Sequence, residues 1–290
     1  MGIRESSIDR VFNVFVYALV ILAAGLALFP LFYVFSISFS SEKEFLTRGF
    51  YLFPQEFTLD GYRYLMAHPG FTQAFRNAVI LGVVGTLINI VFTTLMAYGL
   101  SKPWLKLRAS INFLVFFTIL FSGGMIPTYL VAKSLHLLDS FWAIWLSSAI
   151  SAFNTIVMRG FFQSIPVELE ESARIDGSGE WRLLAAIILP LSLPAIATFT
   201  LFYFVSNWNT YFSAILYLND NRLMPLQVFL RQMIVEGGDT TLSNASNLEF
   251  QYTPAAKMAA IVLTALPLLV IYPFLQKHFN KGVLLGSVKG

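Results

Sequence analysis

Long apolar runs constrain the fold of this chain more than any other feature. The first run extends from Val11 to about Ile37 and contains no charged residue. An apolar stretch of about 18 residues or more can cross the hydrocarbon core of a bilayer as a single helix. Only 12% of the residues are charged, which is half of the ~25% that is typical of soluble domains. The sequence therefore predicts an all-α integral membrane protein.

Six apolar runs follow one another along the chain, and we expect each to be a membrane-spanning helix. Their approximate ranges are 11–37, 78–100, 111–131, 141–161, 191–218 and 255–275. The first run is longer than the apolar core of a signal peptide, which has about 7–15 residues, so we interpret it as an uncleaved helix. The segment Ser122–Gly124 interrupts the third range. Trp142 and Trp145 open the fourth range, as is typical of aromatic anchors at a membrane–water interface.

The basic residues predict the orientation of these helices. Lys102, Lys106 and Arg108 crowd the short loop after the second range, and short loops rich in Lys and Arg stay in the cytoplasm. Six spans would place both ends of the chain on the same side of the membrane. The cytoplasmic segments are then expected to be the N-terminus 1–10, the loop 164–190 and the tail 276–290.

The composition excludes several kinds of chemistry. The chain contains no Cys, so disulfides, thiolate metal sites and Cys nucleophiles are ruled out. Its three His residues are far apart and form neither an HExxH nor a His-x-His pair. The formal net charge is only +3, and in a membrane protein a small basic excess mostly reports cytoplasmic loops. We expect no catalytic residues, no metal site and no nucleic-acid partner.

The loop 164–190 is one of the most charged segments of the chain. Pro166 suits the first turn of a helix, where its missing N–H costs nothing. Glu168 and Glu170 would then lie near the positive end of that helix. Gly177 can adopt the left-handed conformation that ends a helix, and Ser178 can cap the next one. These residues predict a helix–turn–helix beside the membrane, which is either an interfacial helix pair or a docking surface for another protein.

The same loop resembles the EAA loop of binding-protein-dependent ABC importer permeases. That pattern is Glu-Ala-Ala, three residues, Gly, nine residues and then Ile-x-Leu-Pro, and the spacing here matches it without a gap. The one departure is Ser172, a small side chain in place of Ala. The matched positions are Glu171, Ser172, Ala173, Gly177, Ile187, Leu189 and Pro190, to which Asp176 adds the Asp-Gly pair of the sugar-importing branch.

Most of the chain is similar to the smaller, six-span subunit of the maltose-type carbohydrate importers. The runs 121–129 (FSGGMIPTY) and 281–290 (KGVLLGSVKG) favour the subgroup that transports polysaccharides and complex oligosaccharides. The resemblance implies a type I ABC importer permease with six transmembrane helices and a cytoplasmic coupling-helix loop. It also implies a bacterial plasma (inner) membrane location.

The resemblance further implies the partners of the chain. The first helix of the loop would dock in a separate ATP-binding subunit, and Glu171 would make the charged contact. No GxxxxGK[ST] phosphate loop occurs in the sequence, so this chain would bind no cofactor, and ATP and Mg would be used by that subunit. The expected assembly contains a second homologous permease, two copies of the ATP-binding subunit, an extracytoplasmic solute-binding protein and an oligosaccharide substrate in a lipid bilayer.

Two segments have an expected role that the residues leave open. The loop 220–252 is polar and long enough to reach a docked binding protein, or it serves only as a capping loop. The tail 276–290 either reaches toward the ATPase or is a basic end held near anionic lipid.

Polar residues inside the expected spans are candidates for a substrate path. Asn154 lies in the fourth range, and Asn207, Trp208, Asn209 and Tyr211 form a run in the fifth. Amide groups and aromatic faces together suit sugar rings. However, Asn side chains also form hydrogen bonds across helix interfaces in membranes, so a packing role is the main alternative for these residues.

Two other classes of protein stay open on the residues alone. A polytopic membrane enzyme, such as a glycosyl- or lipid-transferase, could hold a metal with the acidic residues Glu168, Glu170, Glu171 and Asp176, although neither an Asp-x-Asp pair nor a His accompanies them. A stand-alone secondary carrier would need an ion site, and no charged residue lies deep inside an expected span.

Overall fold

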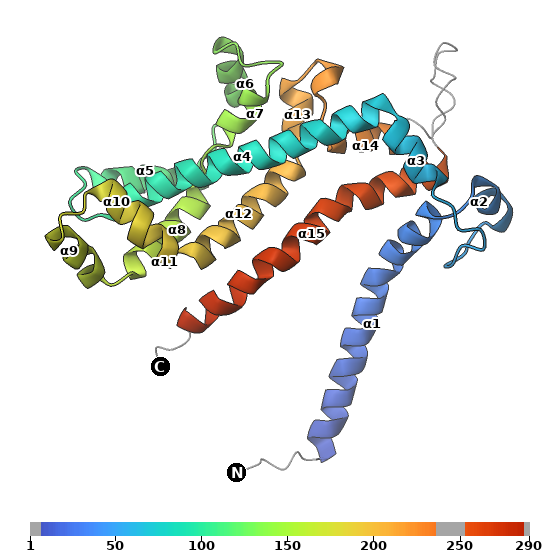
Figure 1. The fold of residues 1–290 in the computed structure, drawn as a ribbon, viewed down its shortest axis with the longest axis horizontal. Helices are drawn as coiled ribbons and strands as arrows, with labels where there is room; N and C mark the ends of the chain where they lie inside the picture. Colours follow the sequence, from blue (N-terminus) through green and yellow to red (C-terminus); the bar gives the residue numbers. More distant parts are fainter. Residues whose placement is uncertain (1–6, 236–252, 287–290) are drawn as a thin grey trace. The chain divides into compact units, whose positions relative to one another are not determined.

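The computed structural model describes residues 7–235 and 253–286, and within them all regular structure is helical apart from one isolated antiparallel bridge between Ser40 and Phe57. The helices are α1 (Ser7–Ser38), α2 (Glu42–Arg48), α3 (Asp60–Ala67), α4 (Pro69–Ser101), α5 (Arg108–Leu120), α6 (Met125–Ser134), α7 (Phe141–Ser147), α8 (Ala152–Ser164), α9 (Val167–Ile175), α10 (Glu180–Leu183), the π-helix η1 (Leu184–Ile188), α11 (Leu189–Leu191), α12 (Leu193–Trp208), α13 (Phe212–Tyr217), the 3-10 helix η2 (Asn221–Leu223), α14 (Leu226–Val235) and α15 (Pro254–Gly286) (Figure 1).

Three helices are long and apolar enough to cross a membrane unaided. They cover Arg10–Ser38, Pro69–Ser101 and Pro254–Pro273. Three bent pairs pass the same test only when each is taken as one span: α5 with α6 at 117°, α7 with α8 at 54°, and the helices before and after Ser192 at 83°. The predicted all-α membrane architecture is confirmed, and six spans result when each bent pair counts as one.

Several expected boundaries differ from the helices in the structure. Helix α4 begins at Pro69 rather than at residue 78, since Pro is well accommodated in a first turn. The expected fifth range, 191–218, is divided because α12 ends at Trp208 and α13 begins only at Phe212. The predicted interruption of the third range at Ser122–Gly124 is confirmed, because α5 ends at Leu120 and α6 begins at Met125, after Gly124 with a φ of 85°. Trp145, expected as an interface anchor, is instead buried in the protein.

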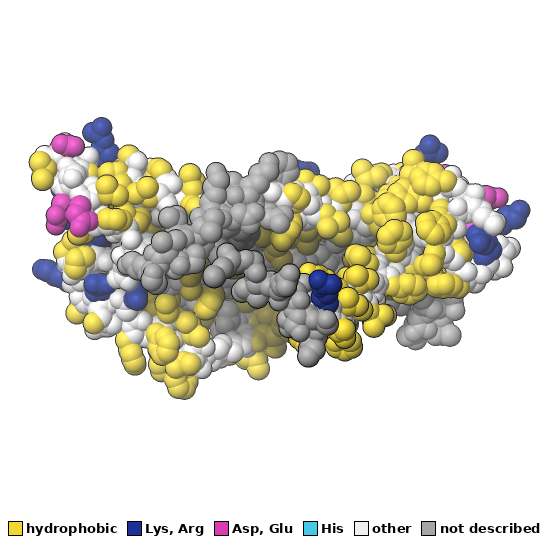
Figure 2. Space-filling view, turned by 90° about the horizontal axis from the view of Figure 1, so that it is seen from below, with side chains coloured by type: hydrophobic (Ala, Val, Ile, Leu, Met, Phe, Trp, Pro, Cys, Tyr) yellow, Lys and Arg dark blue, Asp and Glu magenta, His cyan; other side chains and the backbone are white. Residues whose placement is uncertain are grey.

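The contacts of the described residues group them into two compact units. The first unit comprises Met1–His68 with Leu230–Ala265, and the second comprises Pro69–Phe229 with Leu266–Gly290. Many large hydrophobic side chains of the described residues are exposed, and they cover much of the surface in Figure 2 that is not grey. Such a surface is unfavourable in water and suits lipid contact.

In the first unit, a buried carboxylate organises the segment that follows α1. Glu44 is 5% exposed. Its Oε1 accepts hydrogen bonds from Arg48 Nη1 at 2.5 Å and from the Gln55 N–H at 2.8 Å, and its Oε2 accepts the Glu56 N–H at 3.2 Å. The ring of Phe50 stacks on Tyr33 of α1 with centroids 5.3 Å apart. Local polar contacts and aromatic stacking therefore shape this short helical segment.

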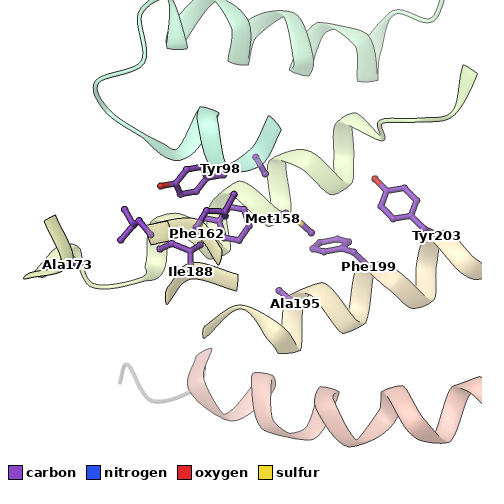
Figure 3. Packing of buried hydrophobic residues seen from close by; sticks show 11 residues of the cluster. Tyr98, Met158, Phe162, Ala173, Ile188, Ala195, Phe199 and Tyr203 are labelled. Carbon is purple, nitrogen blue, oxygen red and sulfur yellow. The ribbon is translucent and has the colours of Figure 1, made fainter. Parts of the chain in front are cut away.

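In the second unit, α4 contacts α12, α8, α7 and α5. One hydrophobic cluster joins the end of α4 to α8, α12 and the loop 164–190, and Figure 3 shows its side chains meeting between these elements. Its buried members are Ala97, Tyr98, Met158, Phe162, Ala173, Leu183, Leu184, Ile188, Ala195, Phe199 and Tyr203. The loop is thus packed onto the membrane helices.

Candidate functional site

The turn after α9 has the geometry that the sequence predicts. Gly177 has a φ of 79°, a left-handed conformation that costs glycine little. Its N–H donates to the Arg174 carbonyl at 3.0 Å, and the Ser178 N–H donates to the Ala173 carbonyl at 2.9 Å. These two bonds form a Schellman motif, which satisfies the last carbonyls of a helix. The prediction that Gly177 ends the helix is confirmed.

The two predicted helix starts are each displaced by one residue. Pro166 is the N-cap of α9 and not a residue of its first turn. The N-cap of α10 is Gly179, with no side-chain hydrogen bond, so the prediction that Ser178 caps this helix is wrong. The reason is the Schellman motif, because Ser178 contributes its N–H to closing the preceding helix.

The second half of the loop continues from α10 into a π-helix, and this helix ends just before Leu189 and Pro190. Pro190 lacks the N–H that a regular helix needs at that position. The fully buried residue here is Ile188, while the motif residues Ile187 and Leu189 are partly buried against the cluster of Figure 3. Sequence reasoning missed Ile188, although it lies between two matched positions.

Helix α9 buries one narrow face and exposes the rest. Only Glu170 and Ala173 are buried among its residues. The matched residues Glu171, Ser172, Asp176 and Gly177 are exposed, and in the described part of the chain no hydrogen bond or ion pair occupies Glu171. Its carboxylate is therefore available for contact with another molecule.

Four large apolar side chains are also exposed in this loop, and the two most exposed ones were missed by the sequence analysis. Ile175, the last residue of α9, is 86% exposed, and Trp181 of α10 is 74% exposed. Exposed apolar side chains rimmed by polar ones often mark protein contacts, and Trp is enriched among the residues that dominate binding energy. The signal in the sequence is an apolar residue on each side of a charged turn.

A buried ion pair joins this loop to the end of α4. Lys102 Nζ lies 2.5 Å from Glu170 Oε1, and the two side chains are 3% and 11% exposed. Arg174 Nη2 lies 2.9 Å from Glu180 Oε1 and 3.8 Å from Glu170 Oε2. These ion pairs give Glu170 and Glu180 basic partners. No group of three or more candidate metal ligands exists among the residues that the structure describes.

The candidate substrate residues do not form a single site. Asn207 is buried, and its Nδ2 donates to Asn89 Oδ1 at 2.8 Å. Trp208 is 1% exposed and stacks on Phe204 with centroids 5.9 Å apart. The side chains of both residues therefore contribute to packing, which was the main alternative to a substrate role.

The remaining candidates lie closer to the surface or stand apart. Asn209 is exposed, its Nδ2 donates to the Val205 carbonyl at 2.9 Å, and its Oδ1 accepts Gln227 Nε2 at 3.2 Å. Tyr211 is half-buried against a second hydrophobic cluster. Asn154 is buried near the start of α8, where its N–H donates to Ser151 Oγ at 3.3 Å.

Polar side chains from α4 and α12 hold the break between α7 and α8. Asn89 Nδ2 donates to the carbonyls of Ser148 at 2.5 Å and Ala149 at 3.1 Å. The Ser151 N–H donates to the Tyr203 hydroxyl at 3.4 Å. A broken helix in a membrane frees backbone groups that must find partners within the protein, and these side chains provide them.

Comparison with known proteins extends these observations. Residues 98–285 match the family described as binding-protein-dependent transport system inner membrane component. The polygalacturonan/rhamnogalacturonan transport system permease protein YtcP of Bacillus subtilis (strain 168) is 47% identical over 284 residues, covering 97% of this chain and 99% of the relative. Protein LplC of the same organism is 48% identical over 268 residues, covering 92% and 90%.

A solved structure is also similar along nearly the whole chain. It is described as a bacterial ABC transporter involved in the import of the acidic polysaccharide alginate, and it matches with a TM-score of 0.88 and 33% identity over 96% of this chain and 100% of its own. The family and YtcP are described as transport components and not as enzymes. The importer family expected from the Glu171–Pro190 spacing is therefore confirmed. The chain belongs to the binding-protein-dependent transport system inner membrane components.

Proposed function

We propose that this chain is one permease subunit of an ATP-driven ABC importer that carries an oligosaccharide or polysaccharide delivered by an extracytoplasmic binding protein. The observation that carries this proposal is the surface of α9 and α10, where Glu171, Ile175 and Trp181 are exposed on a loop that is otherwise packed onto the membrane helices. One face of this loop packs onto the membrane helices, and the other exposes both charged and apolar side chains. This arrangement suits a loop that transmits motion from a docked ATPase to the membrane helices.

The proposed topology places the loop 164–190 in the cytoplasm together with residues 1–10 and the tail 276–290, and the six-span permease domain covers 11–275. The basic loop after α4 supports this orientation. The described part of the expected outer loop 220–252 is not an open loop but forms η2 and α14, while residues 236–252 and the end of the tail lie outside the described residues. Their proposed contacts with a binding protein and with the ATPase rest on the family alone.

ATP and Mg are proposed to act in the partner subunit. Two copies of that subunit would close on each other when ATP binds and would carry α9 and its equivalent in a second permease with them. Such a change is driven by contacts that differ between two states of the assembly. On this chain the matched residue Glu171 is the proposed charged contact.

The proposed substrate is a sugar polymer or a fragment of one. One relative is named for polygalacturonan and rhamnogalacturonan, and the similar solved structure is described by alginate import. Of the candidate path residues, Asn209, Asn154 and Tyr211 are those for which we retain a proposed role toward the sugar. The contacts of Asn207 and Trp208 support packing instead.

A pull-down tests this function directly. The tagged chain is purified in mild detergent, and the eluate is assayed for ATP hydrolysis with and without a loaded binding protein. We expect a second permease and an ATPase to co-elute, and hydrolysis to rise with the loaded binding protein. The variant Glu171→Ala should lose the ATPase, whereas Glu168→Ala, an exposed acid on the same helix, should keep it. A wild-type chain that elutes alone would contradict the proposal.

A further inference from the structure

The contact between α9 and the membrane helices depends on very few side chains. Of the nine residues of α9, only Glu170 and Ala173 are buried. Ala173 contributes one methyl group to the hydrophobic cluster of Figure 3, where it is labelled at the edge of the group. Glu170 provides the other attachment, through its ion pair with Lys102, the residue directly after α4.

The ion pair is shielded from water, which makes its two members depend on each other. The Lys102 side chain is 3% exposed, and its Nζ lies 2.5 Å from Glu170 Oε1. Removing one partner of a buried pair leaves an uncompensated charge, and this costs far more than the loss of an exposed pair. Breaking this attachment is therefore costly.

The pair belongs to a closed ring of five side chains. Lys102 Nζ lies 4.4 Å from the ring centroid of Tyr98, and the Tyr98 hydroxyl donates to Glu180 Oε2 at 2.7 Å. Arg174 completes the ring by contacting both Glu180 and Glu170. The ring connects the end of α4 with α9 and α10, so neither helix of the loop can move away from α4 without breaking it.

We infer that Lys102 and Glu170 are positioning residues that fasten α9 to α4, so that a displacement imposed on α9 by an ATPase moves α4 with it. This inference rests on the proposed function. It goes beyond the docking role of Glu171, because Lys102 and Glu170 touch neither the ATPase nor the sugar in this scheme. Their effect is on the transmission of the motion through the chain.

The experiment uses the complex that co-elutes with the tagged chain and a reporter on α4. The chain contains no Cys, so Arg76→Cys, at an exposed position toward the other end of α4, gives a single thiol in this subunit. Its labelling rate by a maleimide is measured with and without ATP and vanadate, alongside ATP hydrolysis. The variants are Lys102→Gln, Glu170→Gln and the charge exchange of Lys102→Glu with Glu170→Lys. The controls are Lys102→Arg and Glu168→Gln.

In the otherwise unaltered chain, ATP with vanadate should change the labelling rate by about threefold or more. Lys102→Gln and Glu170→Gln should keep the ATPase bound and hydrolysing ATP, but should lose most of the labelling change. Both control variants should retain the change, and the charge exchange should restore part of it. A structural role alone would not give hydrolysis without movement of α4.

Several results would overturn the inference. One is a normal labelling change in both Gln variants, and another is a wild-type α4 that does not respond to ATP at all. If the Gln variants fail to assemble, the labelling experiment is repeated with Arg174→Gln. The Arg174 side chain is 41% exposed, so its replacement should destabilise the chain less. A normal labelling change in that variant would then contradict the ring. Loss of the ATPase from the wild-type chain would instead contradict the proposed function.

Discussion

The Asn207 amide nitrogen lies 2.8 Å from the Asn89 amide oxygen, and Asn89 donates in turn to the carbonyls of Ser148 and Ala149. One side chain of α4 therefore connects α12 to the break between α7 and α8. Replacing Asn89 with Leu would leave two carbonyls and an amide without these partners. A buried polar group without a partner costs about 1–3 kcal/mol.

We expect Asn89→Leu to lower the free energy of unfolding by an amount within that range. The unfolding temperature of the chain purified in detergent should fall accordingly. The matched control is Asn209→Ala, because Asn209 is exposed. This variant should unfold at nearly the wild-type temperature. Differential scanning fluorimetry on both variants checks this. An unchanged midpoint for Asn89→Leu would contradict the role of Asn89 in holding the break between α7 and α8.

A second prediction concerns two glycines of α4. A Cβ atom at Gly85 would lie 2.9 Å from the Asn207 side-chain carbon, whereas a Cβ at Gly99 would meet nothing within 4 Å. Overpacking a buried site costs about 1–3 kcal/mol, and Ala favours a helix over Gly by up to ~1 kcal/mol. Gly85→Ala should therefore destabilise the purified chain, while Gly99→Ala should be neutral or stabilising. Equal unfolding temperatures in the two variants would contradict the close approach of α12 at Gly85.

The turn at Gly177 gives a third prediction, with a control that separates backbone strain from contact with a partner. Nothing lies within 4 Å of a Cβ placed there, but φ is 79°, a conformation that a β-branched side chain strongly disfavours and Asn tolerates. Gly177→Val should therefore weaken ATPase retention in the pull-down severalfold, whereas Gly177→Asn should largely preserve it. Loss of the ATPase in both variants would indicate that the partner itself packs against this position.

A fourth prediction is a pH dependence in the segment after α1. Burial raises the pKa of Glu44, but the N–H groups of Gln55 and Glu56 and the Arg48 guanidinium outweigh it and hold the pKa below its ordinary value. A carboxyl with a lowered pKa contributes stability above the ordinary carboxyl pKa and loses that contribution as the pH falls through the lowered value.

Hydrogen exchange checks the pH dependence. After correction for intrinsic rates, the amide protons of Gln55 and Glu56 should be protected at neutral pH and should lose protection in acid. In Glu44→Gln the protection should be lower at neutral pH and should change little with acidification. Acid-stable protection in the wild-type chain would show that Glu44 does not hold this segment.

The sequence predicts those parts of the fold that depend on local properties. The long apolar runs of α1 and α15 and the left-handed turn at Gly177 require only neighbouring residues, and all three were predicted. The break before Ala152 was not predicted, because neither Gly nor Pro marks it. Its partner on α4, Asn89, lies 59 residues from Ser148 and 60 from Ala149 along the chain.

The ring around Lys102 was missed for the same reason. Glu170 lies 68 residues from Lys102. In the sequence, the charge of Glu170 is explained by its place near a helix start, and the charge of Lys102 by its place in a basic loop. The run from Asn207 to Asn209 shows a further limit. A helix turns by about 100° per residue, so side chains that are adjacent in sequence point in different directions, and only the structure separates the buried Asn207 from the exposed Asn209.

The anchoring of the α7–α8 bend by Asn89 has a consequence for building hybrid permeases from this chain and its relatives. The 54° bend between α7 and α8 depends on contacts with α4. If only the segment from α7 to α8 is transferred to another permease, the contacts that hold the bend are not transferred with it. In a recipient whose α4 lacks an amide at the position of Asn89, the α7–α8 segment would have to straighten, or the carbonyls at its bend would lack hydrogen-bond donors. Exchange units in this family should therefore be cut so that α4 and the α7–α8 pair are transferred together.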